Sequence, residues 1–329
     1  MERKKLKILH VIPYHPSPSA FIFAKRQVED LSELGHSNEI FYFNTAFSIL
    51  GFFEQLKSLK KKVAAFSPDI IHAHYGTINA FFASRITNVP LVVSFHGSDI
   101  NHTRDVHWLR EKLGKALSAK AAKCAQQIIC VSEKLQDNLP NGKEKSRVLA
   151  SGINTRMFRE MDMQFCKERL GLDLNKQYVF FNSNNPIVKR LDIAEEAVQL
   201  LSDLNVALLS LNGNVEPNEI PVYLNSCVAC LLCSDSEGSP MVIKEAMACA
   251  LPIVSVDVGD VCERIQSVTN SYIIPQDATE IAKKIRLLIS SNNPKTNGLE
   301  VLREQGLDYL SVASQLENIY FKAMQLDRQ

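Results

Sequence analysis

The alternation of apolar runs with amphipathic stretches divides the chain into two series of strands and helices. Short apolar runs predict a first series of buried strands at residues 7–13, 40–44, 70–73, 91–95, 128–131 and 147–150. Helical patterns such as residues 23–34 and 109–125 separate these runs. A second series of buried runs follows at residues 179–182, 206–211, 228–233, 253–256 and 272–274, again with helices between. This alternation predicts an α/β fold with two Rossmann-like domains, each built on a parallel sheet.

The pattern also predicts where the domains meet. The polar stretch at residues 154–176 indicates a connection, so we expect an N-terminal domain over residues 1–151 and a C-terminal domain over residues 152–306. The remaining segment, residues 307–329, begins with an amphipathic pattern that predicts a final helix. Open parallel sheets bind ligands beyond the carboxyl ends of their strands, so two such domains facing one another would enclose a central cleft.

Two carboxylates stand eight positions apart across a turn between a predicted strand and a predicted helix. The strand is the run at residues 227–233, and Glu237 lies just beyond its carboxyl end. Glu245 lies more than one turn inside the helix, where a carboxylate can accept both hydroxyls of a ribose. An isolated pair at this spacing would more often be two solvated glutamates on a surface helix. The buried strand and the Gly-Ser-Pro turn favour a sugar-nucleotide site instead, with Glu237 facing the sugar.

The turn between these carboxylates predicts a phosphate site. Ser239 is a good N-cap residue, and Pro240 fits the first helical position because its missing N–H costs nothing there. The amides of residues 241–243 would then point outward unpaired. A helix start carries about half a positive charge and free N–H donors, so it binds phosphate. Gly238 would let a ligand approach the backbone closely.

Residues 237–245 resemble the donor-site motif of the family 4 retaining glycosyltransferases of the GT-B fold, E-G-x-P-x-x-x-x-E. Further stretches resemble the family in order and position: residues 7–13 its first strand, 95–99 its H-G-x-D loop, 150–158 its entry to the second domain and 189–192 its K-G phosphate loop. The resemblance covers nearly the whole chain. It implies the GT-B fold and a terminal helix that crosses back to the N-terminal domain.

The resemblance also implies roles for individual residues. Glu237 would approach the donor sugar, Lys189 would neutralise the charge that develops on the diphosphate, and His96 would reach the sugar from the N-terminal domain. The other expected donor contacts are Arg190, Asn184, Gly238, Ser239, Pro240, Met241, Val242 and Glu245, and the expected acceptor-side residues are Asp99, His15 and Ser19. Asp99 would orient either His96 or the acceptor.

The sequence departs from the family pattern in three places. The arginine that usually precedes the lysine by about five residues is absent, so either Arg190 or the amides of Asn184 and Asn185 would contact the phosphates. The first loop, residues 13–19, has three prolines and no glycine, which argues against phosphate contact through it. Gly259-Asp260 stands where a Gly-Gly pair is more usual.

A formal net charge of +1 hides a strong asymmetry between the two halves of the chain. Residues 1–150 hold 21 Lys and Arg against 13 Asp and Glu, a net charge of +8, whereas the remainder holds 16 against 23, a net charge of −7. The basic half could face anionic acceptor phosphates or, peripherally, the inner face of an anionic membrane. A solvated helix face is the alternative explanation for its densest lysine cluster, residues 57–63.

We expect no metal and no cofactor besides the donor substrate. His72 and His74 would share one face of a strand, but a third ligand would have to be His96 or His102, and the resemblance implies no metal. The three cysteines between residues 227 and 233 lack a fourth at the iron–sulfur spacing, so they are interpreted as buried apolar residues. Eight cysteines without a recognisable secretory signal favour a reducing, cytoplasmic compartment.

These observations predict a retaining, metal-independent glycosyltransferase that moves a sugar from a UDP- or GDP-linked donor to a surface polysaccharide or a lipid-linked glycan. One alternative is a sugar-nucleotide epimerase of the same fold, which the complete donor motif disfavours. The other is a non-catalytic scaffold that binds a sugar nucleotide, which the missing arginine leaves open. The first strand is not followed by G-x-G-x-x-G, which argues against a nicotinamide dehydrogenase, and no nucleic-acid-binding motif is recognisable.

Overall fold

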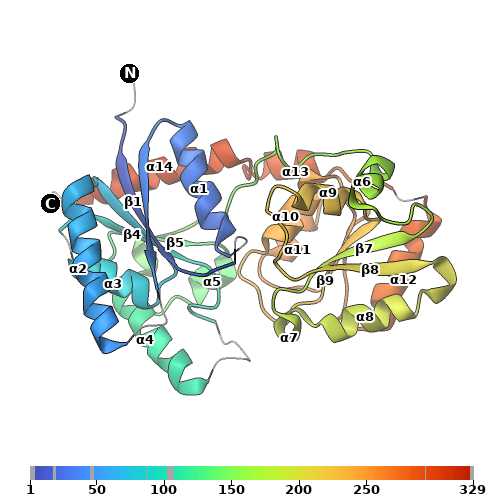
Figure 1. Cartoon of the computed structure of the whole chain (residues 1–329), viewed down its shortest axis with the longest axis horizontal. Helices are drawn as coiled ribbons and strands as arrows, with labels where there is room; N and C mark the ends of the chain where they lie inside the picture. The colour runs from blue at the N-terminus through green and yellow to red at the C-terminus, as the bar shows by residue number, and fades with distance from the viewer. Residues whose placement is uncertain are drawn as a thin grey trace. The chain divides into compact units, whose positions relative to one another are not determined.

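The computed structural model describes residues 4–17, 20–44, 48–86, 88–101, 107–292 and 294–326. The chain forms two compact units (Figure 1). The N-terminal unit consists of Met1–Pro16, Phe21–Gly152 and Tyr309–Gln329, and the C-terminal unit consists of Ser17–Ala20 and Ile153–Asp308.

Within the described residues, the N-terminal unit holds a six-stranded parallel sheet in the order β2-β1-β3-β4-β5-β6. Its strands are β1 (Lys7–Pro13), β2 (Ser37–Phe43), β3 (Ile70–His74), β4 (Leu91–Phe95), β5 (Gln127–Cys130) and β6 (Ser146–Val148). Every residue of β3, β4 and β5 is buried, as expected for central strands that are covered on both faces.

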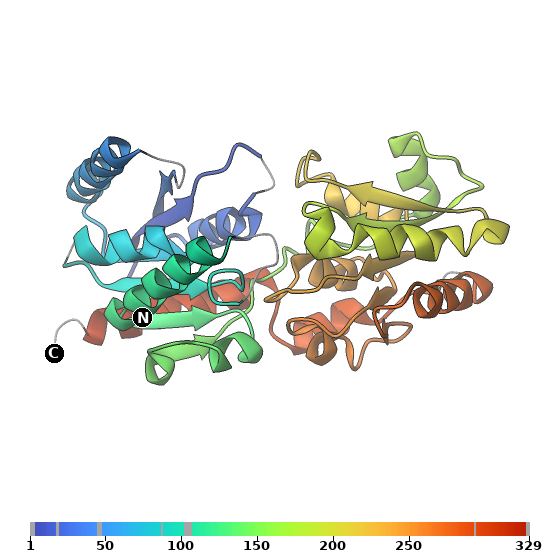
Figure 2. The ribbon, with the colours of Figure 1, turned by 90° about the horizontal axis from the view of Figure 1, so that it is seen from below.

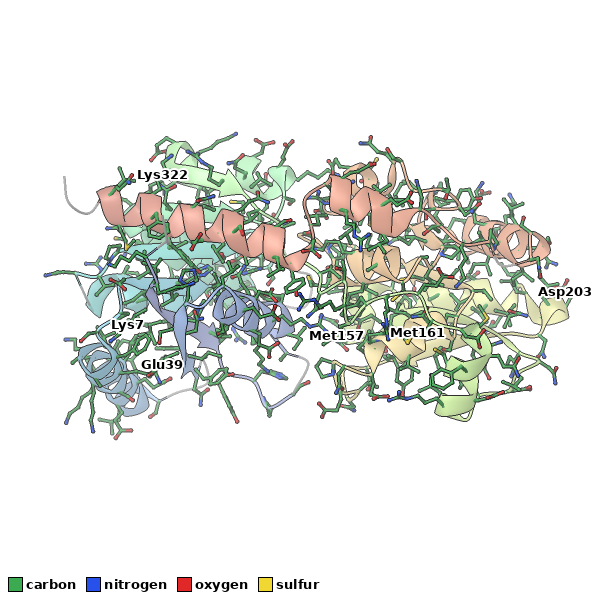
Figure 3. The ribbon with its side chains drawn as sticks, turned by 90° about the horizontal axis from the view of Figure 1, so that it is seen from above. Lys7, Glu39, Met157, Met161, Asp203 and Lys322 are labelled. Carbon is green, nitrogen blue, oxygen red and sulfur yellow. The ribbon has the colours of Figure 1, made fainter. Side chains whose placement is uncertain are left out.

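Helices cover both faces of this sheet. They are α1 (Ile22–Glu33), α2 (Ile49–Phe66), α3 (Ile78–Ile86), α4 (Trp108–Cys124), α5 (Glu133–Asp137) and α14 (Tyr309–Leu326). One face packs against α2, α3 and α4, and the other packs against α1 and α14 (Figure 2). Figure 3 shows α14, with Lys322 near its carboxyl end, lying along the N-terminal unit.

The C-terminal unit is built on a five-stranded parallel sheet, within the part of the chain that the structure describes. The strand order is β11-β10-β9-β7-β8. The strands are β7 (Gln177–Asn182), β8 (Val206–Leu211), β9 (Ala229–Leu232), β10 (Ile253–Ser255) and β11 (Tyr272–Ile273). The helices are α6 (Met163–Leu170), α7 (Pro186–Lys189), α8 (Leu191–Gln199), α9 (Ile220–Asn225), α10 (Met241–Ala248), α11 (Val261–Ile265), α12 (Ala278–Ser290) and α13 (Gly298–Glu304).

Two layers of helices enclose this second sheet. One face forms a core with α8 and α12, through residues such as Ala194 and Ile285. The helix α10 packs on β9 and β10, and α13 packs closely on α10. A Cβ on Gly298 at the start of α13 would lie only 2.7 Å from the Met247 backbone. These contacts hold α10, which follows β9 in the chain, against the sheet.

The predicted α/β fold with two Rossmann-like sheets is confirmed, and the differences are at the ends of elements. The final helix begins at Tyr309, two residues later than predicted. The two preceding residues pair with the start of the C-terminal unit instead, since Ile153 N–H donates to Leu307 O at 2.9 Å and Ile153 forms a β-bridge with Asp308.

Candidate functional site

Lys189 and Glu237 form an ion pair at the carboxyl end of β9 in the C-terminal unit. Glu237 lies in the loop between β9 and α10, and Lys189 is the last residue of α7. The Lys189 ammonium bonds to Glu237 Oε1, which also accepts a hydrogen bond from Ser234 Oγ at 2.8 Å. Both charged side chains are largely shielded, with 16% and 15% of their surface exposed. The predicted phosphate-binding cation and sugar-facing carboxylate therefore lie side by side.

The start of α10 differs from the prediction. Pro240 is the N-cap and Met241 the first helical residue, whereas Ser239 had been expected to cap the helix. The reason is tertiary: Ser239 Oγ donates to Asp260 Oδ2 at 2.8 Å and accepts from Lys244 Nζ at 3.1 Å. Because Ile243 N–H donates to Pro240 O at 3.3 Å, the amides that open the helix are those of Met241 and Val242.

The body of α10 is buried from Val242 to Ala248. Glu245, the expected ribose ligand, is 8% exposed and lies one turn into the helix. Beside it, Lys244 is only 1% exposed. Burial lowers the pKa of Lys244 to about 8, and the nearby Asp260 carboxylate opposes that shift. Neither Lys244 nor Asp260 had a predicted role, although the departure from the family pattern at Gly259-Asp260 was a signal for Asp260.

The loop before Lys189 is held by local hydrogen bonds. Asn185 caps α7 by accepting the Val188 N–H at 3.4 Å, and Asn184 is exposed, with its N–H donating to Asn182 Oδ1 at 3.2 Å. Asn184 is thus accessible to a ligand. Its phosphate contact stays a prediction.

Arg190, the other candidate for the missing arginine, is bound to carboxylates. Its guanidinium donates to Asp192 Oδ2 at 2.8 Å and to Gln276 at 3.2 Å, and it lies 3.5 Å from Asp235. Hydrogen bonds to Asp192 raise the pKa of Arg190 further above its ordinary value. A phosphate contact by Arg190 would have to compete with these acidic partners.

In the N-terminal unit, Asp99 organises the loop that carries His96. The Asp99 carboxylate is 2% exposed and accepts backbone N–H groups from Gly76 at 3.0 Å, His96 at 3.1 Å and Gly97 at 2.9 Å. Of the two roles expected for Asp99, these bonds fit the orientation of His96 through its backbone. The His96 ring packs on Phe23, with ring centroids 4.3 Å apart.

The other acceptor-side predictions concern the loop after β1. His15 is exposed. Ser19 lies outside the described residues.

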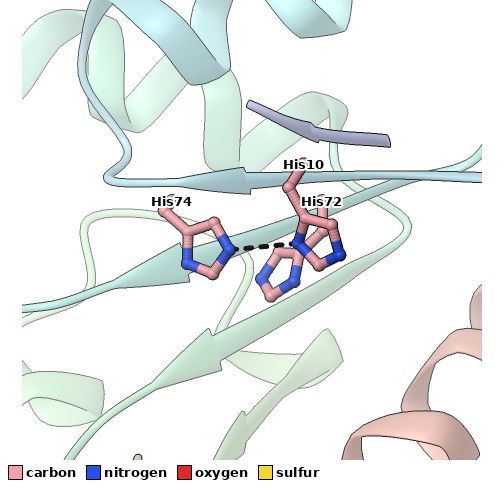
Figure 4. Close-up of side chains that lie close together, drawn as sticks. All are labelled: His10, His72 and His74. Atoms are coloured by element: carbon pink, nitrogen blue, oxygen red, sulfur yellow. Dashed lines mark hydrogen bonds between the residues drawn. The ribbon is translucent and has the colours of Figure 1, made fainter. Parts of the chain in front are cut away.

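Three buried histidines on β1 and β3 lie close together (Figure 4). One ring nitrogen from each of His10, His72 and His74 lies within 4.8 Å of the others. His96 or His102 is the third ligand that a metal site on β3 was predicted to need, and His102 lies outside the described residues. His96 does stack on His74, with ring centroids 5.9 Å apart, but the third member of the cluster is His10, whose Cα is paired with that of His72 in the β1–β3 register. A correct prediction of how β1 pairs with β3 would therefore have placed His10 beside His72.

Hydrogen bonds account for most of these ring nitrogens. His10 contacts His74 at 3.4 Å and Asn38 at 3.1 Å. His72 contacts Tyr320 OH at 2.8 Å and Ser94 Oγ at 2.7 Å. Burial lowers the pKa of His10 to about 4 and the pKa values of His72 and His74 well below 6.5. A metal ion would have to displace these hydrogen bonds, so we interpret the cluster as a neutral, hydrogen-bonded part of the core.

Two family models match the chain. The model described as Glycosyltransferase Family 4 matches residues 10–156, and that described as Glycosyl transferases group 1 matches residues 189–291. Among known proteins, TuaC of Bacillus subtilis, named as a glycosyltransferase of teichuronic acid biosynthesis, is 28% identical over 252 residues. This alignment covers 70% of the chain, and the chain spans 63% of the length of TuaC.

Solved structures show the same fold. Sucrose-phosphate synthase from Thermosynechococcus elongatus superposes with a TM-score of 0.77 at 14% identity, covering 98% of this chain and 100% of that one. HepE from Anabaena, solved in complex with UDP and glucose, superposes with a TM-score of 0.72 at 18% identity, covering 95% and 98%. Together with the matches to both halves of the sequence, these likenesses show that the chain belongs to the family 4 glycosyltransferases and has their GT-B fold.

Proposed function

We propose that the protein is a retaining, metal-independent glycosyltransferase that moves a hexose or related sugar from a UDP- or GDP-linked donor to a surface polysaccharide or a lipid-linked glycan. The observation that carries this proposal is the Lys189–Glu237 pair beside the start of α10, with Glu245 one turn further in. The stereochemical outcome rests on membership of the family.

The chemistry of sugar transfer explains why these groups are needed together. The leaving diphosphate gains negative charge in the transition state, and fixed donors and cations stabilise it. Lys189 and the amides of Met241 and Val242 would supply that positive charge from the protein itself, without a metal. Glu237 would then lie beside the donor sugar, and Glu245 would accept the ribose hydroxyls. The complex of HepE with UDP and glucose supports a UDP-linked donor, and the name of TuaC supports a polymer acceptor.

The N-terminal unit also supports peripheral contact with an anionic membrane, where lipid-linked acceptors reside. Large apolar side chains stand exposed near the amino ends of two helices on the same face of the sheet: Leu50 and Phe53 on α2, and Trp108, Leu109 and Leu113 on α4. Lysines follow them along both helices. Apolar side chains flanked by cations are typical of interfacial binding. No helix among the described residues is long and apolar enough to cross a bilayer.

The test is a thermal-shift panel of UDP, GDP, ADP and CMP in the presence of EDTA, on the parent protein and on Lys189→Ala. We expect one nucleoside diphosphate to stabilise the parent, and the variant to lose that stabilisation. Lys283→Ala is the matched control, because Lys283 forms an exposed ion pair with Glu280 in the same unit. No shift with any nucleotide would refute the proposed donor site. A donor that is consumed to a product of unchanged mass without an acceptor would instead identify an epimerase.

A further inference from the structure

We propose that Lys244, Ser239 and Asp260 form a buried charged clasp that fixes the donor-binding loop, residues 237–240, and that Lys244 and Asp260 are positioning residues for sugar transfer. This inference rests on the proposed function, because it assigns the clasp to the same donor site.

The clasp links three segments of the C-terminal unit through one hydroxyl group. Ser239 Oγ lies 2.8 Å from Asp260 Oδ2, to which it donates, and 3.1 Å from Lys244 Nζ, from which it accepts. Arg264 Nε donates to the same Asp260 oxygen at 2.8 Å from one turn along α11. Lys244 and Asp260 are 1% and 5% exposed, so solvent screens their interaction little.

Charge explains why aspartate stands at position 260, where the family resemblance leads one to expect glycine. A lysine that is buried on α10 loses its hydration, and it needs a nearby carboxylate to remain charged. Asp260 supplies that carboxylate. A glycine at this position would leave buried Lys244 near the partly exposed Arg264 guanidinium without the carboxylate of residue 260. The unusual residue in the loop and the buried lysine in the helix thus form one arrangement.

Backbone contact transmits the position of the clasp to the reacting groups. Next to Asp260, Gly259 approaches the donor loop so closely that a Cβ on it would lie 2.8 Å from the Gly238 carbonyl oxygen. Glu237 precedes Gly238 in this loop and is bonded to Lys189. A shift of the segment at 259–260 would therefore move the carboxylate and disturb its pairing with the cation, without removing either group.

A double-mutant cycle tests the clasp. Lys244→Met, Asp260→Asn and the double variant are compared with the parent by titration calorimetry with the nucleoside diphosphate that the parent binds, and by donor KM and kcat. Each single change is expected to weaken nucleotide binding and raise donor KM about tenfold, and the double variant is expected to lose less than the product of the two, because the residues interact. Asp203→Asn is the control, since it breaks an exposed pair with Arg286 in the same unit.

Ser239→Ala removes only the bridging hydroxyl and guards against variants that fail to fold. It is expected to weaken nucleotide binding about threefold to tenfold, because the hydroxyl's hydrogen bonds to Asp260 and Lys244 are both lost. Clasp variants that melt earlier but keep the parent's nucleotide affinity and donor KM would overturn the proposal, because the clasp would then be structural only. A parent that binds none of the four nucleotides would overturn the proposed function, and the clasp proposal with it.

Discussion

Replacing Gly259 with alanine should weaken both the C-terminal unit and its donor site. Gly259 has a φ of +60°, in the left-handed region that costs a residue with a Cβ about 1–2 kcal/mol. The new Cβ would also lie 2.8 Å from Gly238 O and 3.3 Å from Glu237 O, closer than ordinary contact. Such overpacking costs about 1–3 kcal/mol, so the free energy of unfolding should fall by about 2–5 kcal/mol in total.

A second glycine separates the two contributions. Gly171 at the end of α6 has a φ of +65°, but a Cβ there would have nothing within 4 Å. Gly171→Ala should therefore show only the backbone cost, about 1–2 kcal/mol, and leave nucleotide affinity unchanged. The excess loss in Gly259→Ala reports the close approach of the two loops. Part of that strain should be relieved by displacement of the donor loop, which we expect to weaken nucleotide binding at least about fivefold.

The assay is differential scanning calorimetry of the parent and both variants, with titration calorimetry for the nucleotide. For a unit of this size, each kcal/mol should lower the melting temperature of the C-terminal transition by about 2–4 °C. Equal melting temperatures and equal nucleotide affinities for Gly259→Ala and Gly171→Ala would refute the reasoning. The contact between Gly259 and Gly238 would then be too soft to hold the donor loop.

Three further predictions concern the N-terminal unit. Its free energy of unfolding should fall as the pH drops from about 6.5 to 4, because His10 takes up a proton in the unfolded chain but stays neutral when buried. The full effect is about 3 kcal/mol. Urea denaturation at several pH values should show a shallower pH dependence for His10→Gln, and an unchanged slope would contradict the assignment. Tyr320→Phe should lower the free energy of unfolding by about 1–3 kcal/mol, because it removes the hydroxyl that contacts His72, whereas Tyr14→Phe at an exposed position should not. Trp108→Ser should reduce binding to vesicles that contain anionic lipid by about tenfold, as measured by sedimentation. Leu174→Ser changes an exposed residue of the other unit and should leave this binding unchanged. Equal binding by both variants would argue against a membrane face on α4.

The strands were predictable from the sequence because each is a short apolar run, and burial on both faces of a parallel sheet requires such runs. The site was harder to predict from the sequence, because its decisive contacts join residues that are far apart in the chain. The bond from Lys189 to Glu237 spans 48 positions, and no local pattern predicts it, although the family resemblance places both residues at the donor site. Ser239 was misjudged for the same reason: its local preference for an N-cap gave way to Asp260, 21 positions away.

Some features of the site could have been found by closer attention to neighbouring residues. Asp192 stands two positions after Arg190, and the pair forms a short-range ion pair that occupies the guanidinium. The histidine cluster follows from the register of β1 against β3, but a register needs the tertiary pairing of strands that are about 60 residues apart, as His10 and His72 are.

The path of the chain through the two units has a consequence for truncated forms of the protein. Ile153 and Asp308 form a β-bridge, and Thr155 Oγ1 donates to Asp308 at 2.6 Å, so the chain enters and leaves the C-terminal unit at neighbouring points. The helices and strands of this unit therefore lie on one continuous stretch of chain, residues 153–308, whose two ends meet. The N-terminal unit is not continuous, since Leu316 and Tyr320 of α14, which follow the C-terminal unit in the sequence, cover one face of its sheet. A truncation before residue 309 would therefore leave an N-terminal sheet that exposes an apolar face to chaperones and proteases.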